Sequence, residues 1–354
     1  MSKVKLEDVA KEHKEVLSGD KAGLPIVGLE HLIPKQIKLE NWDIDVDNTF
    51  TKMFRKGNVL FGRRRAYLKK AAYATIDGIC SGDITVIEAL PGKILPELLP
   101  FIIQNDDLFD YAVGKSAGSL SPRVKWEHLK NYEFELPEDL NKQKEIADLL
   151  WSMIETKNSY QDMIKATNDL VKSQFIEQFS VEKALKSGIT IKSFDDVFED
   201  CTKEGLKIPT DDYLKQGNYP VVDQGQDLIS GYWNDDEGLY SDVPAIIFGD
   251  HTRILKYVDF PFFLGADGVK LLKLKEDNNY KYMFYALLTQ EIPNEGYQRH
   301  FKWLKKLKIT VPDINTQIKF AAMSEQSDKS KFELKKCLEE LEKTYKKIVS
   351  ENLG

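Results

Sequence analysis

The chain has 354 residues, 42% of them hydrophobic and 30% charged, and a formal net charge of −7 at pH 7. This length predicts two or three domains, and the composition is typical of a globular protein. Three widely spaced cysteines indicate neither a disulfide framework nor a zinc knuckle. The sequence has neither a basic-then-apolar leader nor an apolar run of about 18 residues, so we expect a cytoplasmic protein.

The first globular domain is predicted over residues 1–140. Short apolar runs at 58–61 and 84–87, separated by glycines, predict β-strands and turns. Hydrophobic residues between positions 95 and 113 recur at helical spacing and predict a helix. We therefore expect an α/β domain.

A single long helix is predicted over residues 141–187. From Ile146 to Phe179, hydrophobic residues keep a spacing of three or four without a proline, and Gly188 ends the pattern. At 1.5 Å per residue, about 45 residues extend roughly 68 Å. A hydrophobic stripe of that length predicts a partner helix that covers it.

The second half of the chain predicts another domain, over 188–313, and another long helix, over 314–354. Strands are expected at 245–248 and 269–272 and a short helix at 280–289. The final helix is expected to be shorter than the first one. Two long helices bury their stripes most simply on each other as an antiparallel pair, with the two domains at opposite ends.

Short motifs of the first half recur in the same order in the second half, which predicts an internal repeat with pseudo-twofold symmetry. The expected fold is therefore α+β, with two similar α/β domains joined by two long antiparallel helices in a coiled coil. The matched motifs are 25–27 with 220–222, 60–62 with 247–249, 129–137 with 304–312, and 140–143 with 314–317.

Basic stretches interrupt the acidic chain in both repeats. Residues 52–76 contain eight lysines and arginines and no acid, and 296–312 contain five, with His300, and again no acid. Local potential governs contact with a ligand, whereas net charge governs long-range attraction. This distribution predicts DNA binding that a partner protein assists.

The predicted DNA contacts are mainly cations in these and neighbouring stretches. Guanidinium groups suit both phosphate oxygens and the guanine edge, and an adjacent tyrosine can pack on a sugar or base. The alternative is a solvated turn or a plain connection. The candidates in the first domain are Arg63, Arg64, Arg65, Tyr67, Lys69, Ser119, Arg123 and Lys125, and those in the second are Arg253, Lys256, Lys270, Arg299 and Lys302.

Two enzyme patterns fail on inspection. Asp250 and His251 form an isolated acid–base pair without a nucleophile pattern. Asp313 with Lys319 imitates a nuclease motif, but Asp313 stands where polar side chains cap helices, and Asp139 occupies the same place in the first repeat. The histidines show no metal-ligand spacing. We therefore predict no catalytic residue and no metal site in this chain.

The repeated motifs of the two halves resemble those of the specificity (S) subunits, HsdS, of Type I restriction–modification enzymes. The resemblance covers essentially the full length. In the first half it rests on 61–70, 77–83, 116–126 and 134–137; in the second half it rests on 219–222, 231–232, 248–253 and 266–270, together with the two helix starts.

The resemblance implies that residues 1–140 and 188–313 are target-recognition domains, each of which binds one half of a bipartite double-stranded DNA target. The conserved helices, 141–187 and 314–354, would set the spacing and dock two modification subunits, which bind S-adenosylmethionine and methylate DNA. Restriction subunits would add translocation and cleavage driven by ATP with Mg²⁺, in a bacterial or archaeal defence against foreign DNA. The alternative is a two-headed protein-interaction scaffold without a DNA role.

Overall fold

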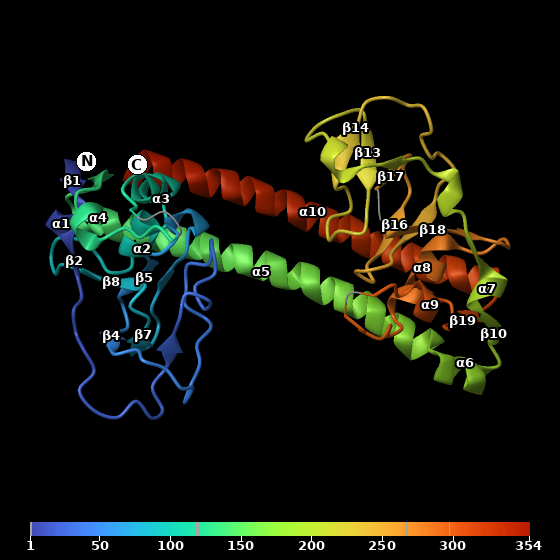
Figure 1. Ribbon diagram of the computed structural model, residues 1–354, viewed down its shortest axis with the longest axis horizontal. Helices are drawn as coiled ribbons and strands as arrows, with labels where there is room; N and C mark the ends of the chain where they lie inside the picture. The colour runs from blue at the N-terminus through green and yellow to red at the C-terminus, as the bar shows by residue number, and fades with distance from the viewer. Residues whose placement is uncertain (1, 118–120, 266–267, 297) are drawn as a thin grey trace. The chain divides into compact units, whose positions relative to one another are not determined.

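In a computed structural model, the chain divides into two compact units. One unit comprises Met1–Gln161 with Lys335–Gly354, and the other comprises Asp162–Leu334. The structure describes residues 2–117, 121–265, 268–296 and 298–354. Each unit contains one α/β domain and part of each of two long helices (Figure 1).

The first domain is built on two small sheets. The larger sheet is antiparallel with strand order β2-β8-β5-β6, and the smaller has the order β3-β7-β4, with β3 parallel to β7. The predicted runs at 58–61 and 84–87 are strands β5 and β8. The strands are β2 (Ala10–Glu12), β3 (Ile26–Val27), β4 (Lys52–Phe54), β5 (Val59–Gly62), β6 (Ala71–Tyr73), β7 (Gly78–Cys80) and β8 (Ile84–Ala89).

The helix expected at 95–113 is two helices, α2 (Leu99–Ile103) and α3 (Asp106–Gly114). Asn105 separates them because its side chain accepts a hydrogen bond from the backbone N–H of Asp107, which starts a new helix. The break lets both helices cover the larger sheet. Phe61 of β5 stacks on Phe109 of α3 with ring centroids 5.4 Å apart.

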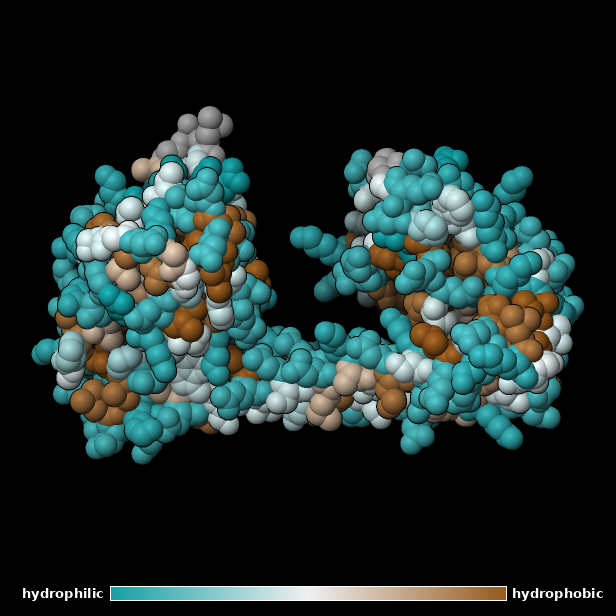
Figure 2. Space-filling view, turned by 90° about the horizontal axis from the view of Figure 1, so that it is seen from below, coloured by the Kyte–Doolittle hydropathy of each residue, from teal (hydrophilic) through white to brown (hydrophobic). Residues whose placement is uncertain are grey.

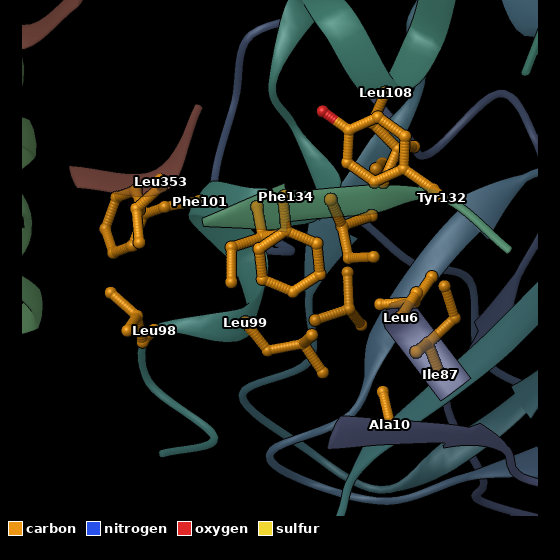
Figure 3. Packing of buried hydrophobic residues seen from close by; sticks show 14 of the residues in the cluster. Leu6, Ala10, Ile87, Leu98, Leu99, Phe101, Leu108, Tyr132, Phe134 and Leu353 are labelled. Atoms are coloured by element: carbon orange, nitrogen blue, oxygen red, sulfur yellow. The ribbon is translucent and has the colours of Figure 1, made fainter. Parts of the chain in front are cut away.

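Figure 3 shows the core of this unit. Leu98, Leu99 and Phe101, at the start of α2, gather with Phe134 of β9 (Glu133–Leu136) and Leu353 of the last helix. All five side chains are buried. The end of the chain's final helix is therefore part of the hydrophobic core of the first unit.

The second domain repeats this plan. Its antiparallel sheet has the order β11-β18-β15-β16, which matches β2-β8-β5-β6 strand for strand, and its other sheet has the order β12-β17-β13-β14. The predicted helix at 280–289 is α8 (Tyr280–Leu288). The strands are β11 (Phe198–Asp200), β12 (Lys207–Ile208), β13 (Tyr219–Val222), β14 (Gly231–Trp233), β15 (Ala245–Gly249), β16 (Leu255–Val258), β17 (Phe263–Gly265) and β18 (Val269–Leu274).

Each domain begins and ends in one two-stranded ribbon. Strand β1 (Ser2–Lys5) pairs with β9, and β10 (Thr190–Ser193) pairs with β19 (Lys308–Val311). A one-turn helix follows the first strand of each ribbon, and another precedes the second strand. These helices are α1 (Leu6–Val9), α4 (Trp126–Leu129), α7 (Phe194–Val197) and α9 (Phe301–Leu304).

The two long helices are α5 (Leu140–Phe179) and α10 (Ile314–Leu353), and each has 40 residues. The expectation that the second is shorter is wrong. The predicted continuation of the first to 187 is also interrupted, because the Ser180 side chain caps a separate helix, α6 (Val181–Ser187). Gly188, with φ of 71°, ends α6 in the left-handed conformation that glycine favours.

Within the second unit the long helices run antiparallel. Phe175 of α5 contacts Phe320 of α10, and Asn168, earlier in α5, accepts a hydrogen bond from Lys331, later in α10. Within the first unit, Lys157 and Glu342 form an ion pair of 3.0 Å between the same two helices. The predicted fold class, two similar α/β domains joined by two long antiparallel helices, is confirmed.

The outer surfaces of the helices are less hydrophobic than the seam. Figure 2 shows the visible side of the long helices as mostly hydrophilic, with a few hydrophobic residues among them. Leu170 and Phe332 are examples of exposed hydrophobic side chains on these helices. Among the described residues, every helix is too short or too polar to cross a membrane.

A buried glutamine joins each domain to its long helix. The Gln143 amide accepts from the Leu95 backbone N–H (3.0 Å) and donates to the Pro137 carbonyl (2.8 Å). Gln317 accepts from the Asn279 N–H (2.9 Å) and donates to the Pro312 carbonyl (2.9 Å). The repeat thus preserves a polar contact as well as the hydrophobic pattern.

Candidate nucleic-acid interface

Three segments of the first domain meet where β5 ends. Arg63 donates its backbone N–H to the Asp83 carbonyl (3.0 Å), and its own carbonyl accepts from Val124 N–H (3.0 Å). Two residues further on, Arg65 donates its backbone N–H to the Pro122 carbonyl (2.8 Å). The two stretches that the sequence predicts to bind DNA, around 61–70 and 121–126, are therefore neighbours. We call the set of residues 63–65, 81–83 and 121–125 the first cationic surface.

Asp83 lies among the arginines of this surface. Its carboxylate accepts from Arg123 Nε at 2.7 Å and Nη2 at 3.3 Å, and it pairs with Arg64 Nη1 at 3.5 Å. The hydrogen bond from Arg123 lowers the pKa of Asp83 below its usual value, against the opposing effect of burial. The carboxylate therefore stays charged and fixes both guanidinium groups while they remain about two-fifths exposed.

The turn that follows Arg64 is held in an unusual conformation. Arg65 and Lys69 flank the short helix η1 (Ala66–Leu68), and both have left-handed φ values, 55° and 51°. Non-glycine residues adopt this conformation rarely and at some energetic cost. The result is that Tyr67 projects with 54% of its surface exposed, and Arg65 is also exposed.

The remaining candidates of the first domain differ in their partners. Lys69 pairs with Asp106 (2.6 Å) and Asp110 (3.7 Å) of α3, and the hydrogen bond to Asp106 raises the pKa of the lysine. Lys125 is exposed just before α4. Ser119 lies outside the described residues.

In the second domain, the turn 249–253 after β15 occupies the position of 62–65 in the first. Asp250 donates its N–H to the Gly268 carbonyl (2.6 Å), and its carbonyl accepts from His300 N–H (2.8 Å). Its carboxylate accepts from Phe301 N–H (2.7 Å) at the start of α9. Asp250 therefore connects the turn to the segment that carries Arg299.

The predicted cations of the second domain have distinct environments. Arg253 has φ of 63° and donates to the Ile292 carbonyl (3.1 Å), and Arg299 is exposed. Lys270 pairs with Asp200 (2.9 Å), and Lys302 pairs with Glu295 (3.2 Å). Lys256 is 5% exposed, so we do not retain it as a DNA contact. An interior ammonium group cannot reach a phosphate.

Asp83 is a residue of this surface that was not among the predicted DNA contacts, which are mainly cations. The signal was present: Asp83 ends the motif 77–83, and acids next to arginine clusters commonly orient them. Two of the three cysteines, Cys80 and Cys201, are buried, and Cys337 is exposed. Burial raises the pKa of the Cys80 thiol to about 12 and that of Cys201 to about 11. No cluster of three or more His, Cys, Asp or Glu side chains among the described residues could hold a metal ion.

A family model described as Type I restriction modification DNA specificity domain matches residues 25–166 and 186–343. The chain belongs to this family. Its two matches coincide with the two repeats, so the resemblance found from the motifs is confirmed. The specificity subunit of the Type I restriction enzyme EcoR124I/EcoR124II from Escherichia coli is 34% identical over 139 residues. That alignment covers 36% of this chain and 33% of the relative, about a third of its length.

Solved structures of low sequence identity share the fold. The S subunit of a Type I restriction–modification system from M. genitalium matches with a TM-score of 0.60 and 14% identity, over 99% of this chain and 95% of that one. A chain from a second structure, described as the structural basis of complex assembly and conformational transition of the type I R-M system, also matches. Its TM-score is 0.57 and its identity 18%, over 98% of this chain and 96% of that one. At these identities the likeness establishes the architecture.

Proposed function

We propose that this family member is the DNA sequence-recognition subunit of a Type I restriction–modification complex. Each domain binds one half of a bipartite double-stranded target, and the long helices set the spacing and dock two modification subunits. The observation that carries the proposal is the repeated turn. In both domains, a glycine-ended strand leads into an arginine-bearing turn that is bonded to the segment before α4 or α9.

The charges of this chain suit such a division of labour. The exposed Arg65 of the first turn and the partly exposed Arg253 of the second provide phosphate contacts, which usually form the majority in protein–DNA interfaces. The net charge of −7 opposes strong binding by the chain alone. In the proposal, modification subunits contribute the remaining DNA affinity, bind S-adenosylmethionine and methylate the target. Restriction subunits use ATP with Mg²⁺. The chain itself is non-catalytic and acts in the cytoplasm.

The test is an electrophoretic binding assay of this chain with and without its modification subunits, over a range of salt concentrations. We expect binding that requires the partner and weakens steeply with salt, because phosphate contacts release counterions. The alternative, a two-headed protein scaffold, predicts no DNA binding at any salt concentration.

A single-residue comparison sharpens this test. Arg65→Ala removes an exposed guanidinium from the first cationic surface, whereas Lys93→Ala removes an exposed cation elsewhere in the same domain. If Arg65 contacts a base, its loss reduces discrimination at one base pair by roughly 1–3 kcal/mol. Equal methylation by both variants on every altered first half-site would exclude Arg65 from the interface.

A further inference from the structure

The loop 223–230, which connects β13 to β14, has an unusual composition for a domain that binds DNA. It contains Asp223 and Asp227 but no lysine or arginine. The three residues at its tip, Gln226, Asp227 and Leu228, are all exposed. An acidic loop repels phosphate, so electrostatics do not favour its contact with the DNA backbone.

The loop is nevertheless attached to the turn that carries Arg253. Thr252 donates its hydroxyl to the Gln224 carbonyl at 2.7 Å, and His251 donates its backbone N–H to the Gln224 side chain at 3.2 Å. Asp223 closes the base of the loop by accepting from Gly225 N–H (2.7 Å) and from the Ser230 hydroxyl. These bonds place the loop next to the proposed phosphate-binding turn.

A buried lysine fixes the other side of the tip. Lys256 of β16 donates its ammonium group to the Asp227 carbonyl and lies 3.6 Å from the Asp223 carboxylate, with 4% of its side chain exposed. Burial lowers the pKa of this lysine, and the charge of Asp223 opposes that effect. A buried ammonium is costly unless it is paired and hydrogen-bonded. Here both partners of the ammonium group, the Asp227 carbonyl and the Asp223 carboxylate, belong to the loop.

In the first domain, too, a lysine donates to a backbone carbonyl of the corresponding loop, although this lysine occupies a different position. Lys70, which precedes β6, donates to the Leu29 carbonyl at 2.7 Å in the loop that follows β3. Strand β3 corresponds to β13 in the repeat, so both domains use a lysine of the β5–β6 or β15–β16 hairpin to hold this loop. Two non-equivalent lysines perform one task, which indicates that the position of the loop matters in each domain.

We propose that Gln226, Asp227 and Leu228 contact base edges in the half-site bound by the second domain, and that Lys256 is the positioning residue of this loop. The inference rests on the proposed function and assigns part of its specificity. A glutamine amide can bond to the adenine N6/N7 edge, a carboxylate accepts from cytosine N4, and an apolar side chain contacts the thymine methyl group. A carboxylate and an apolar side chain do not suit a phosphate, and the glutamine amide can offer one only a neutral hydrogen bond.

The experiment selects DNA duplexes with a randomised second half-site, using the complex of the full chain with its modification subunits. Gln226→Ala and Leu228→Ala should each lower the preference at one or two adjacent base pairs by roughly 5-fold to 100-fold. The first half-site preference and the salt dependence should stay unchanged, because no phosphate contact is lost. Gln216→Ala, an exposed glutamine before β13, is the matched control and should change no preference.

Lys256→Met tests the positioning role, because methionine keeps most of the apolar stem and removes the ammonium group. It should reduce the preference at the same base pairs as the two tip variants and leave the first half-site untouched, which a general loss of folding would not do. Since Gln226 and Leu228 are exposed, their variants carry the test even if Lys256→Met unfolds the domain.

Two results would overturn the inference and leave the proposed function intact. The first is a selective wild-type complex whose preferences survive both tip substitutions. The second is a uniform loss of affinity for all sequences with a shallower salt dependence, which identifies a phosphate contact. A wild-type complex without any base preference would instead refute the proposed function and, with it, this inference.

Discussion

Arg123 and Asp83 form a two-point ion pair across 40 residues of sequence, with Nε donating to Oδ1 at 2.7 Å and Nη2 donating to Oδ2 at 3.3 Å. The pair joins the turn between β7 and β8 to the segment before α4. It holds one guanidinium of the first cationic surface in a fixed orientation before any ligand arrives. The carboxylate of Asp83 therefore orients the arginines of the first cationic surface.

Asp83→Asn should therefore weaken discrimination at the first half-site. The amide leaves Arg64 and Arg123 without their shared carboxylate, so the guanidinium groups gain freedom and the surface loses one negative charge. Because Arg123 is 44% exposed, solvent screens the pair, and we expect discrimination to fall by less than about tenfold. Competition between specific and altered duplexes measures it. Stronger discrimination in the variant would contradict the orienting role.

The same carboxylate predicts a pH dependence of stability. The folded-state pKa of Asp83 is lowered by the Arg123 hydrogen bond, whereas an unfolded aspartate titrates near about 3.9. The stabilisation is thus present above about pH 4 and is lost as pH falls through the lower folded value. In urea unfolding from about pH 6 to about pH 3, the difference between wild type and Asp83→Asn should shrink in acid. A constant difference would show that the pair does not couple to folding.

The helix seam of the second unit predicts a large effect of one aromatic residue. Phe320 is 5% exposed and lies edge-on to Phe175, with ring centroids 5.1 Å apart. Phe320→Ala should lower the free energy of unfolding by about 3–5 kcal/mol, because it leaves a cavity among aromatic rings. Phe332→Ala, on the same helix and 66% exposed, should change it by about 0.5 kcal/mol or less. Equal effects in chemical denaturation would argue against the seam.

The glutamines at the helix starts should behave as a matched pair. Gln143→Leu leaves the Leu95 N–H and the Pro137 carbonyl buried without the amide, which costs about 1–3 kcal/mol. Gln317→Leu should have a similar cost, whereas Gln161→Leu, at an exposed position of α5, should be nearly neutral. Thermal unfolding of the three variants compares them directly. A stable Gln143→Leu protein would mean that water replaces the amide.

Periodicity in the sequence was sufficient for much of this fold. Strands β5, β8, β15 and β18 and both long helices follow from local hydrophobic patterns, and local patterns reflect burial on one face or both. The breaks at Asn105 and Ser180 were missed, although both residue types cap helices, because the hydrophobic spacing continues through them. Capping competes with periodicity, and a single polar side chain decides the outcome.

The candidate site was less accessible to sequence reasoning. The stretches around 61–70 and 121–126 could be named from their arginines, but not that Asp83 would join them. Lys256 and Arg253 stand three residues apart, yet the first is buried and the second only partly covered. Strand register decides which side chain faces inward, and that register depends on pairing with β15. Which contacts are made to DNA remains a prediction.

The ribbon between β10 and β19 has an evolutionary consequence. Because Thr190 pairs with Val311, the chain enters and leaves the second domain at adjacent backbone positions. A domain with neighbouring ends can be replaced by another of different length without moving the helices that flank it. Recombination at this ribbon would therefore replace the second domain while the first domain stays unchanged.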